Sequence, residues 1–144
     1  MTTPAEPANS DTDDLSIAGD EILYRRVPPQ AVKRSPTTGL AERAGSGDFE
    51  DSDDGTPCSI FIRSKLDENG LGLSDVLKGY EGKVGVAEFS AQDARDAGFG
   101  VVHRPDEEGG PAHGGLTGKK TQGARKKLAK ATRIVVQPPP DPTR

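Results

Sequence analysis

Tryptophan is absent from this sequence, and cysteine occurs only once, as Cys58. A single cysteine cannot form a disulfide within the chain, which excludes a disulfide framework and favours a reducing compartment. No apolar run approaches the roughly 20 residues that a transmembrane helix needs. The first ten residues carry neither a basic nor an apolar stretch, so we expect no signal peptide and a cytoplasmic location.

Apolar residues are also scarce, at 31% of the chain, with four phenylalanines and two tyrosines. Glycine and proline are abundant, at 18 and 12 residues. Such a composition supports only a modest core, which suits one small domain. We expect an α+β fold at residues 20–137, a mixed sheet of about five strands with two or three short helices. Residues 1–19 should form a disordered acidic tail, and residues 138–144 a proline-rich tail.

Strand-forming residues mark most of the expected sheet. β-Branched and aromatic content predicts strands at 22–27, 58–63, 84–89, 99–103 and 134–136, with a weaker, glycine-rich edge strand at 112–117. Within the first strand, Tyr24 and Arg26 share one face, while Leu23 and Arg25 share the other. Residues 30–57 form a long irregular stretch, with Leu40 and Phe49 as its expected anchors to the core.

Helix signals follow the second and third strands. Ser74 is a candidate N-cap for a short helix that should bury Val76, Leu77 and Tyr80. Residues 90–93 have the pattern of a capping box, and the helix that they start should end near residue 98. A third helix is predicted over residues 121–132. If the strands on either side of the second helix are adjacent and parallel, their connection should be right-handed.

Charge is distributed unevenly along the chain. Residues 1–56 hold twelve acidic and five basic side chains, whereas residues 119–133 hold seven basic side chains and no acid. Although the net charge is only −4, the negative and positive charges are therefore concentrated in different parts of the chain. The basic side chains are Lys119, Lys120, Arg125, Lys126, Lys127, Lys130 and Arg133. This cluster is the strongest candidate for a contact surface.

Three interpretations of the basic helix stay open. It can be a solvated surface helix, since cations near a helix C-terminus are favourable without any ligand. It can contact an acidic protein partner, or it can bind the phosphates of RNA or DNA. The shortage of aromatic side chains argues against binding of single strands by base stacking. Our leading expectation is a non-enzymatic accessory or protein-interaction module, with nucleic-acid binding as the alternative.

A second candidate is a cleft built on arginine and histidine. Arg25 and Arg26 are consecutive on a core strand, so their side chains point to opposite faces and at least one should face inward. A buried guanidinium needs an acidic or phosphate partner. His103 and His113 flank a turn, and a hairpin could bring them close for acid–base chemistry. A metal would need a third ligand from residues 106–108, and no metal is expected.

Other motifs are incomplete. Residues 114–121 lack the glycine spacing and the Lys-Ser/Thr pair of a phosphate-binding P-loop. The acidic run at 48–54 lacks the ligand layout and closing glutamate of an EF-hand. Cys58 has no histidine near it in the sequence and is interpreted as a small buried hydrophobe. We expect no cofactor.

Several short segments occur in an order that is similar to that of other proteins. The chain opens with Leu-Tyr-Arg-Arg at 23–26, continues with Gly-Val-Ala-Glu-Phe at 85–89, and places His113 before the basic residues 125–129. In this order it resembles a group of small uncharacterised bacterial proteins over most of residues 21–136. The resemblance implies a bacterial source and a single domain, and it brings no activity.

The opening strand is also similar to ADP-ribosyltransferase-type folds. There a Leu-Tyr-Arg strand is followed by a segment with Ser or Thr, here Ser35, Thr37, Thr38 or Ser59. This similarity implies that the arginine and the serine would meet NAD. Glu88 lies on a strand but lacks the Gln/Glu-x-Glu setting of the catalytic glutamate. An enzyme of this type is the third hypothesis.

Overall fold

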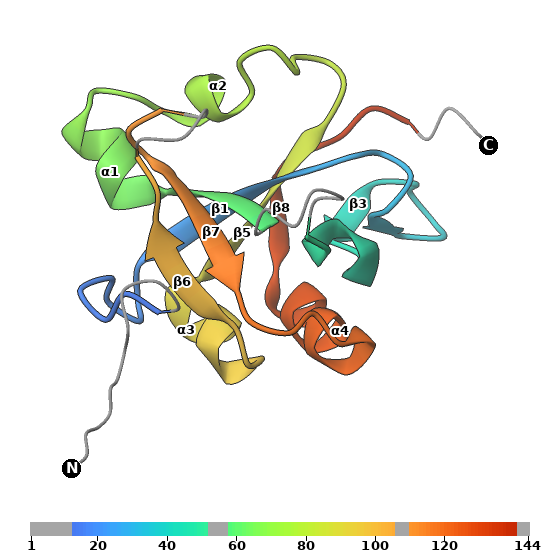
Figure 1. Ribbon diagram of the computed structural model, residues 1–144. Coiled ribbons are helices and arrows are strands. Elements are labelled where there is room, and N and C mark those ends of the chain that lie inside the picture. Colours follow the sequence, from blue (N-terminus) through green and yellow to red (C-terminus); the bar gives the residue numbers. More distant parts are fainter. Residues whose placement is uncertain (1–12, 52–57, 106–109, 141–144) are drawn as a thin grey trace.

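A six-stranded antiparallel sheet organises the chain (Figure 1). The computed structural model describes residues 13–51, 58–105 and 110–140. The strand order is β6-β7-β4-β1-β5-β8. These strands are β1 (Ile22–Val27), β4 (Cys58–Ile62), β5 (Gly85–Ser90), β6 (Gly100–His103), β7 (His113–Thr117) and β8 (Arg133–Val136). β2 (Lys33–Arg34) and β3 (Ala41–Arg43) form a separate antiparallel pair. The α+β class is confirmed.

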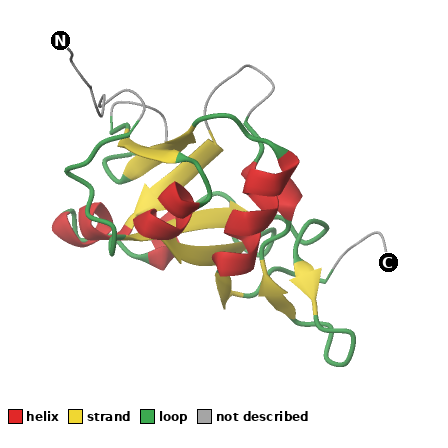
Figure 2. Ribbon diagram, turned by 90° about the horizontal axis from the view of Figure 1, so that it is seen from below, coloured by secondary structure: helices red, strands yellow, loops and turns green. Residues whose placement is uncertain are grey.

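Short helices lie on both sides of the strands (Figures 1 and 2). In Figure 1, α1 (Arg63–Glu68) and α2 (Leu73–Val76) lie above the sheet, and α3 (Ala91–Asp96) and α4 (Gln122–Ala131) lie below it. A 3-10 turn, η1 (Ser46–Phe49), packs beside α4. None of the helices in the described ranges has the length and apolar character that crossing a bilayer requires.

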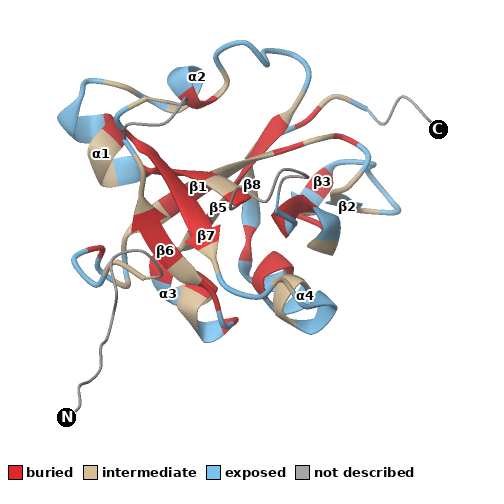
Figure 3. Ribbon diagram, in the orientation of Figure 1, coloured by how far each residue is buried: buried red, intermediate tan, exposed pale blue. Residues whose placement is uncertain are grey.

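Two apolar clusters fill the two faces of the sheet. The larger contains Leu23, Phe49 and Leu128 and lies under α3 and α4. The smaller contains Tyr24 and Phe61 and is covered by α1 and α2. Successive residues of β1 contribute to opposite clusters, as the alternation of a strand requires. Figure 3 shows that much of the central sheet is buried.

The capping box that the sequence predicts at α3 is present. The Ser90 hydroxyl accepts the Asp93 N–H at 3.0 Å, and the Asp93 carboxylate accepts the Ser90 N–H at 3.0 Å. Gly98 follows the helix with φ +103°, a left-handed conformation that favours glycine. Although the sequence suggested that β5 and β6 could be parallel neighbours, three other strands lie between them.

Residues before β1 cover the β6 edge of the large sheet, and β3 packs beside the other edge strand, β8. On β6, the Asp14 N–H donates to the Val101 carbonyl at 2.8 Å, and the Val101 N–H donates to the Asp13 carboxylate at 3.1 Å. Beside β8, the Gln137 amide exchanges two hydrogen bonds with the backbone of Ala41, at 2.8 and 2.9 Å. The contacts at Val101 satisfy backbone groups of the β6 edge that would otherwise be open to another chain.

The boundaries of the domain differ from those expected. Residues 13–19, expected to be a disordered tail, contact the sheet through Asp13 and Asp14, and Ile17 is buried. At the other end, Pro138 is buried and the Pro139 carbonyl accepts a hydrogen bond from Arg34 at 2.8 Å. The rest of the two expected tails, residues 1–12 and 141–144, lies outside the described residues.

Some local predictions were wrong. Phe49 is fully buried as expected, but Leu40 is 55% exposed and anchors nothing. The segment from 112 is not an edge strand, because β7 lies between β6 and β4. α1 was not predicted, and α2 ends so early that Tyr80, expected to be buried, is 45% exposed.

Candidate functional site

The basic helix α4 packs on the larger apolar cluster through a narrow side. The Thr121 hydroxyl caps its start by accepting the Ala124 N–H at 3.1 Å. Leu128 and Ala129 are buried, whereas Lys126 and Lys127 are exposed. Side chains four residues apart lie on one face of a helix, so Lys126 and Lys130 project together.

Three of the seven cations of this stretch are paired within the protein. Each of them meets a carboxylate from another part of the chain. The pairs are Lys120–Asp51 at 2.9 Å, Arg125–Glu50 at 3.5 Å and Arg133–Glu88 at 2.6 Å. Lys120 is the most buried of the three, and it also donates to the carbonyls of Leu116 and Gly118. Lys120 is thus held inside the fold, whereas the pairs of Arg125 and Arg133 lie at the surface and contribute little to stability.

Four cations remain available. Lys119, Lys126, Lys127 and Lys130 are exposed, and none of them forms an ion pair within the described ranges 13–51, 58–105 and 110–140. The candidate surface that the sequence placed along the whole basic stretch is therefore narrower, and it centres on the outer side of α4.

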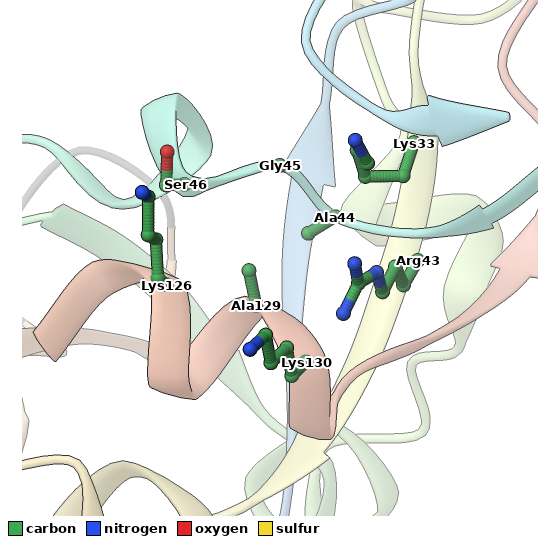
Figure 4. A pocket seen from close by; sticks show the side chains of 8 residues that line it. All are labelled: Lys33, Arg43, Ala44, Gly45, Ser46, Lys126, Ala129 and Lys130. Carbon is green, nitrogen blue, oxygen red and sulfur yellow. The ribbon is translucent and has the colours of Figure 1, made fainter. Parts of the chain in front are cut away.

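A cavity beside α4 gathers two of these lysines with two further cations (Figure 4). Lys33 of β2 and Arg43 of β3 face Lys126 and Lys130 across a space of about 280 Å³. Its remaining lining is small, formed by Ala44, Gly45, Ser46 and Ala129, and includes no acidic residue. We call this cavity the basic pocket. It brings together cations that are more than 80 residues apart in the sequence.

The pairing of β2 with β3 places two positive charges side by side in the basic pocket. Lys33 lies directly opposite Arg43 in the two-stranded sheet. Like charges at opposite positions of a strand pair repel each other. With no carboxylate in the lining, an external anion would relieve this repulsion.

Hydrogen bonds fix the two walls of the basic pocket to each other. The Ala44 N–H donates to the Thr132 hydroxyl at 2.9 Å, and Arg125 donates to the Ser46 carbonyl at 3.3 Å. Gly45 passes so close to Ala31 that a Cβ would collide with the Ala31 carbonyl oxygen. The wall therefore needs glycine here, and the pocket is held in place before any ligand binds.

Asp48 lies buried behind the same wall. One carboxylate oxygen accepts the Gly45 N–H at 2.8 Å, while the other has no partner among the described residues. Burial raises the pKa of Asp48 to about 6, against the opposing effects of the Gly45 hydrogen bond and of Arg25. This carboxyl does not line the basic pocket.

The two consecutive arginines of β1 have different surroundings. Arg25 lies under η1, where it donates to the carbonyls of Asp48 and Ser59, both at 2.8 Å. Arg26 is on the opposite face, with its guanidinium carbon 4.0 Å from the Tyr80 ring centroid and 5.1 Å from that of Phe61. Arg25 thus ties η1 to β4, and Arg26 is held by aromatic rings.

The two histidines are on neighbouring strands but on opposite faces. β6 and β7 form the expected hairpin, and His103 lies opposite Gly114. Because His113 is the next residue, its side chain points to the other face. His103 Nε2 donates to the Pro111 carbonyl at 2.6 Å, while His113 Nε2 lies 3.0 Å from the Ser59 hydroxyl. The four residues of the proposed cleft therefore divide between two faces.

The remaining candidates from the sequence are the histidine-based metal site and Cys58. In residues 13–51, 58–105 and 110–140, no group of three or more His, Cys, Asp or Glu side chains is arranged to hold a metal ion. The acidic residues 106–108, which the sequence offered as further metal ligands beside the two histidines, lie outside the described residues. Cys58 is buried, and burial raises the pKa of its thiol.

Comparison with protein-family models, with curated proteins and with solved structures gives no match. Sequence reasoning found α4 but missed Lys33 and Arg43, which complete the basic pocket. Their sequence signal is weak, since each is one basic residue in a long irregular stretch.

Proposed function

We propose that this protein is a non-enzymatic interaction module that binds an acidic segment of a partner protein in the basic pocket. The observation that carries the proposal is the convergence of Lys33, Arg43, Lys126 and Lys130 on one cavity without a carboxylate in its lining. Arginine offers a planar fork that fits a carboxylate, and the lysines add mobile point charges around it.

The chemistry of the lining favours acidic side chains over nucleic acid. The walls between the cations are alanine, glycine and serine, with no aromatic ring for base stacking. A cavity of about 280 Å³ is at the small end of the range for ligand pockets, and it suits one or two carboxylate side chains. Phosphate contacts along a duplex would instead call for cations spread over a longer surface.

Fluorescence anisotropy can test the proposal with a labelled deca-glutamate peptide as the probe. The peptide should bind at low salt and weaken as the salt concentration rises, since the contacts are largely electrostatic. The double variant Lys126→Glu with Lys130→Glu should weaken binding by about tenfold or more. A charge-matched control, Lys78→Glu with Lys83→Glu, changes exposed lysines away from the pocket and should bind as the wild type does.

Single-stranded RNA and duplex DNA of similar length serve as competing probes in the same assay. Tighter binding of either nucleic acid, lost in the Lys126 and Lys130 variant, would replace the protein-partner proposal by nucleic-acid binding. Equal binding of the peptide to both double variants would reject the basic pocket as the site.

A further inference from the structure

The cations of the basic pocket are divided between two walls. Lys33 and Arg43 come from the β2–β3 pair, and Lys126 and Lys130 come from α4 (Figure 4). Within the described ranges, none of the four side chains forms a hydrogen bond or an ion pair with the rest of the chain. A ligand that neutralises the pocket must therefore reach cations on both walls at once.

The geometry of the ligand's charged group decides whether it can do so. A carboxylate is planar and offers two oxygens with a single negative charge. The phosphoryl group of phosphoserine or phosphothreonine carries a charge of about −1.5 to −2 at pH 7 and offers three strong acceptor oxygens. These oxygens are arranged tetrahedrally, so they point to both walls, whereas the oxygens of one carboxylate point to one side.

The lining between the cations leaves room for such a group. Ala44, Gly45 and Ala129 have short side chains or none, and Ser46 adds a hydroxyl that has no partner among the described residues. A water molecule takes up about 30 Å³ in the liquid. The space of about 280 Å³ therefore accommodates a phosphoryl group together with the short side chain that carries it.

We propose that the basic pocket recognises a phosphorylated serine or threonine within the acidic segment of the partner. This inference rests on the proposed function, and it adds that phosphorylation of the partner controls binding. The Arg43 fork pairs with two phosphoryl oxygens, and the lysines of both walls neutralise the remaining charge. A nucleotide is a poorer fit than a phosphorylated side chain, because the lining has no aromatic ring to stack on a base.

Fluorescence anisotropy of three labelled peptides at pH 7.5 tests the inference. Each peptide has a glycine–serine backbone with four glutamates, and its centre holds one phosphoserine, one glutamate or two adjacent glutamates. The last peptide matches the charge of the phosphopeptide. The phosphopeptide should bind about tenfold more tightly than the charge-matched peptide, since it gains at least one charge-assisted hydrogen bond. Treatment of the phosphopeptide with a phosphatase should remove this advantage.

Single variants on each wall test whether the ligand bridges them. Lys33→Gln removes a charge from the β2–β3 pair, and Lys130→Gln removes one from α4. Each should weaken binding of the phosphopeptide by about fivefold and reduce its advantage over the charge-matched peptide, because both walls contact the same group. The matched control is Lys78→Gln, which changes an exposed lysine outside the pocket lining and should bind all three peptides as the wild type does.

The outcomes separate this inference from the proposed function. Equal affinities for the phosphopeptide and the charge-matched peptide would overturn the phosphoresidue site and leave the proposed function standing. The absence of binding by all three peptides would overturn both. An advantage that stays unchanged in Lys33→Gln and in Lys130→Gln would place the phosphoryl group outside the pocket.

Two further probes distinguish a phosphorylated protein from other sources of phosphate. Complete displacement of the phosphopeptide by an equal concentration of inorganic phosphate would make the free anion the ligand. Vesicles of phosphatidylserine and phosphatidylcholine present phosphate on a membrane surface. Binding to them that is tighter than to the phosphopeptide, and that is lost in the Lys126→Glu, Lys130→Glu protein, would assign the pocket to a membrane and overturn the inference.

Discussion

Burial divides the basic side chains of this protein into two groups with different roles. The Lys120 side chain is 8% exposed and is surrounded by the Asp51 carboxylate and two backbone carbonyls. Replacing Lys120 would leave these two carbonyls without the hydrogen bonds that they accept from it, so its role is structural. Lys126 and Lys130 have no such partners within the described chain, and their charges raise the local potential without stabilising the fold. Only the second group is suited to binding.

Asp48 provides a prediction at the same scale. Its pKa is about 6 in the folded protein, against 3.8 for the ordinary side chain, because burial disfavours the charged form. Between these two pH values the folded protein binds more protons than the unfolded chain, so the free energy of unfolding falls as the pH rises through this window. Ionisation of this one carboxyl should remove about 2–3 kcal/mol.

Asp48→Asn should abolish most of that fall. The amide oxygen can still accept the Gly45 N–H, and no charge has to be buried, so the variant should be at least as stable as the wild type at pH 7.5. Urea unfolding at pH 4.5 and 7.5 measures the difference, with the exposed Asp96→Asn as control. An unchanged pH dependence in Asp48→Asn would show that this carboxyl is not the source.

Among the elements, those set by local rules were predictable from the sequence and those set by distant contacts were not. The capping box at Ser90 and Asp93 involves only neighbours in the chain, so its pattern was sufficient to place α3. The order of the strands depends on which distant strands pair, and the sequence left it open. The basic pocket was missed for the same reason, since Lys33 meets Lys126 only through the fold.

The glycines of β7 show how tertiary contact can override a local interpretation. Glycine in a strand weakens it, which suggested an edge. In the structure, a Cβ at Gly114 would lie 2.6 Å from the Val102 carbonyl oxygen and 3.2 Å from Ile62 Cδ1. The missing side chain thus allows close packing in the interior of the sheet.

Gly114→Ala should therefore lower the free energy of unfolding by about 1–3 kcal/mol, as overpacking does. Gly123→Ala is the matched control, because a Cβ there meets nothing within 4 Å and the residue is helical. That control should leave the protein unchanged or stabilise it by up to about 1 kcal/mol. Chemical denaturation of both variants measures the effect, and equal stability of the two would contradict close packing at Gly114.

On the scale of the whole molecule, the uneven charge of the chain is partly neutralised by folding. Carboxylates of residues 50 and 51 meet cations of residues 125 and 120, so the acidic and basic halves pair with each other near η1 and α4. Folding therefore pairs part of the basic stretch with carboxylates of the same chain. The cations on the outer side of α4 stay available for binding, together with Lys33 and Arg43 of the two-stranded sheet. This division is why the basic pocket, and not the entire stretch, is the functional candidate.

The covered edge of β6 leads to the last prediction. Removing residues 1–16 deletes Asp13 and Asp14, which bond both backbone groups of Val101, and leaves Arg95 without its ion pair at 3.0 Å. We expect the free energy of unfolding to fall by about 2–4 kcal/mol, since each hydrogen bond contributes about 1 kcal/mol and the charged pair more.

The uncovered edge of β6 should also pair with a second copy of the protein, giving self-association that depends on concentration. Removing only residues 1–12 keeps Asp13 and Asp14, and the difference between the two truncations isolates the contribution of residues 13–16. Urea unfolding and light scattering after size-exclusion chromatography measure the two effects, and a stable monomer in the longer truncation would show that this segment does not protect the edge.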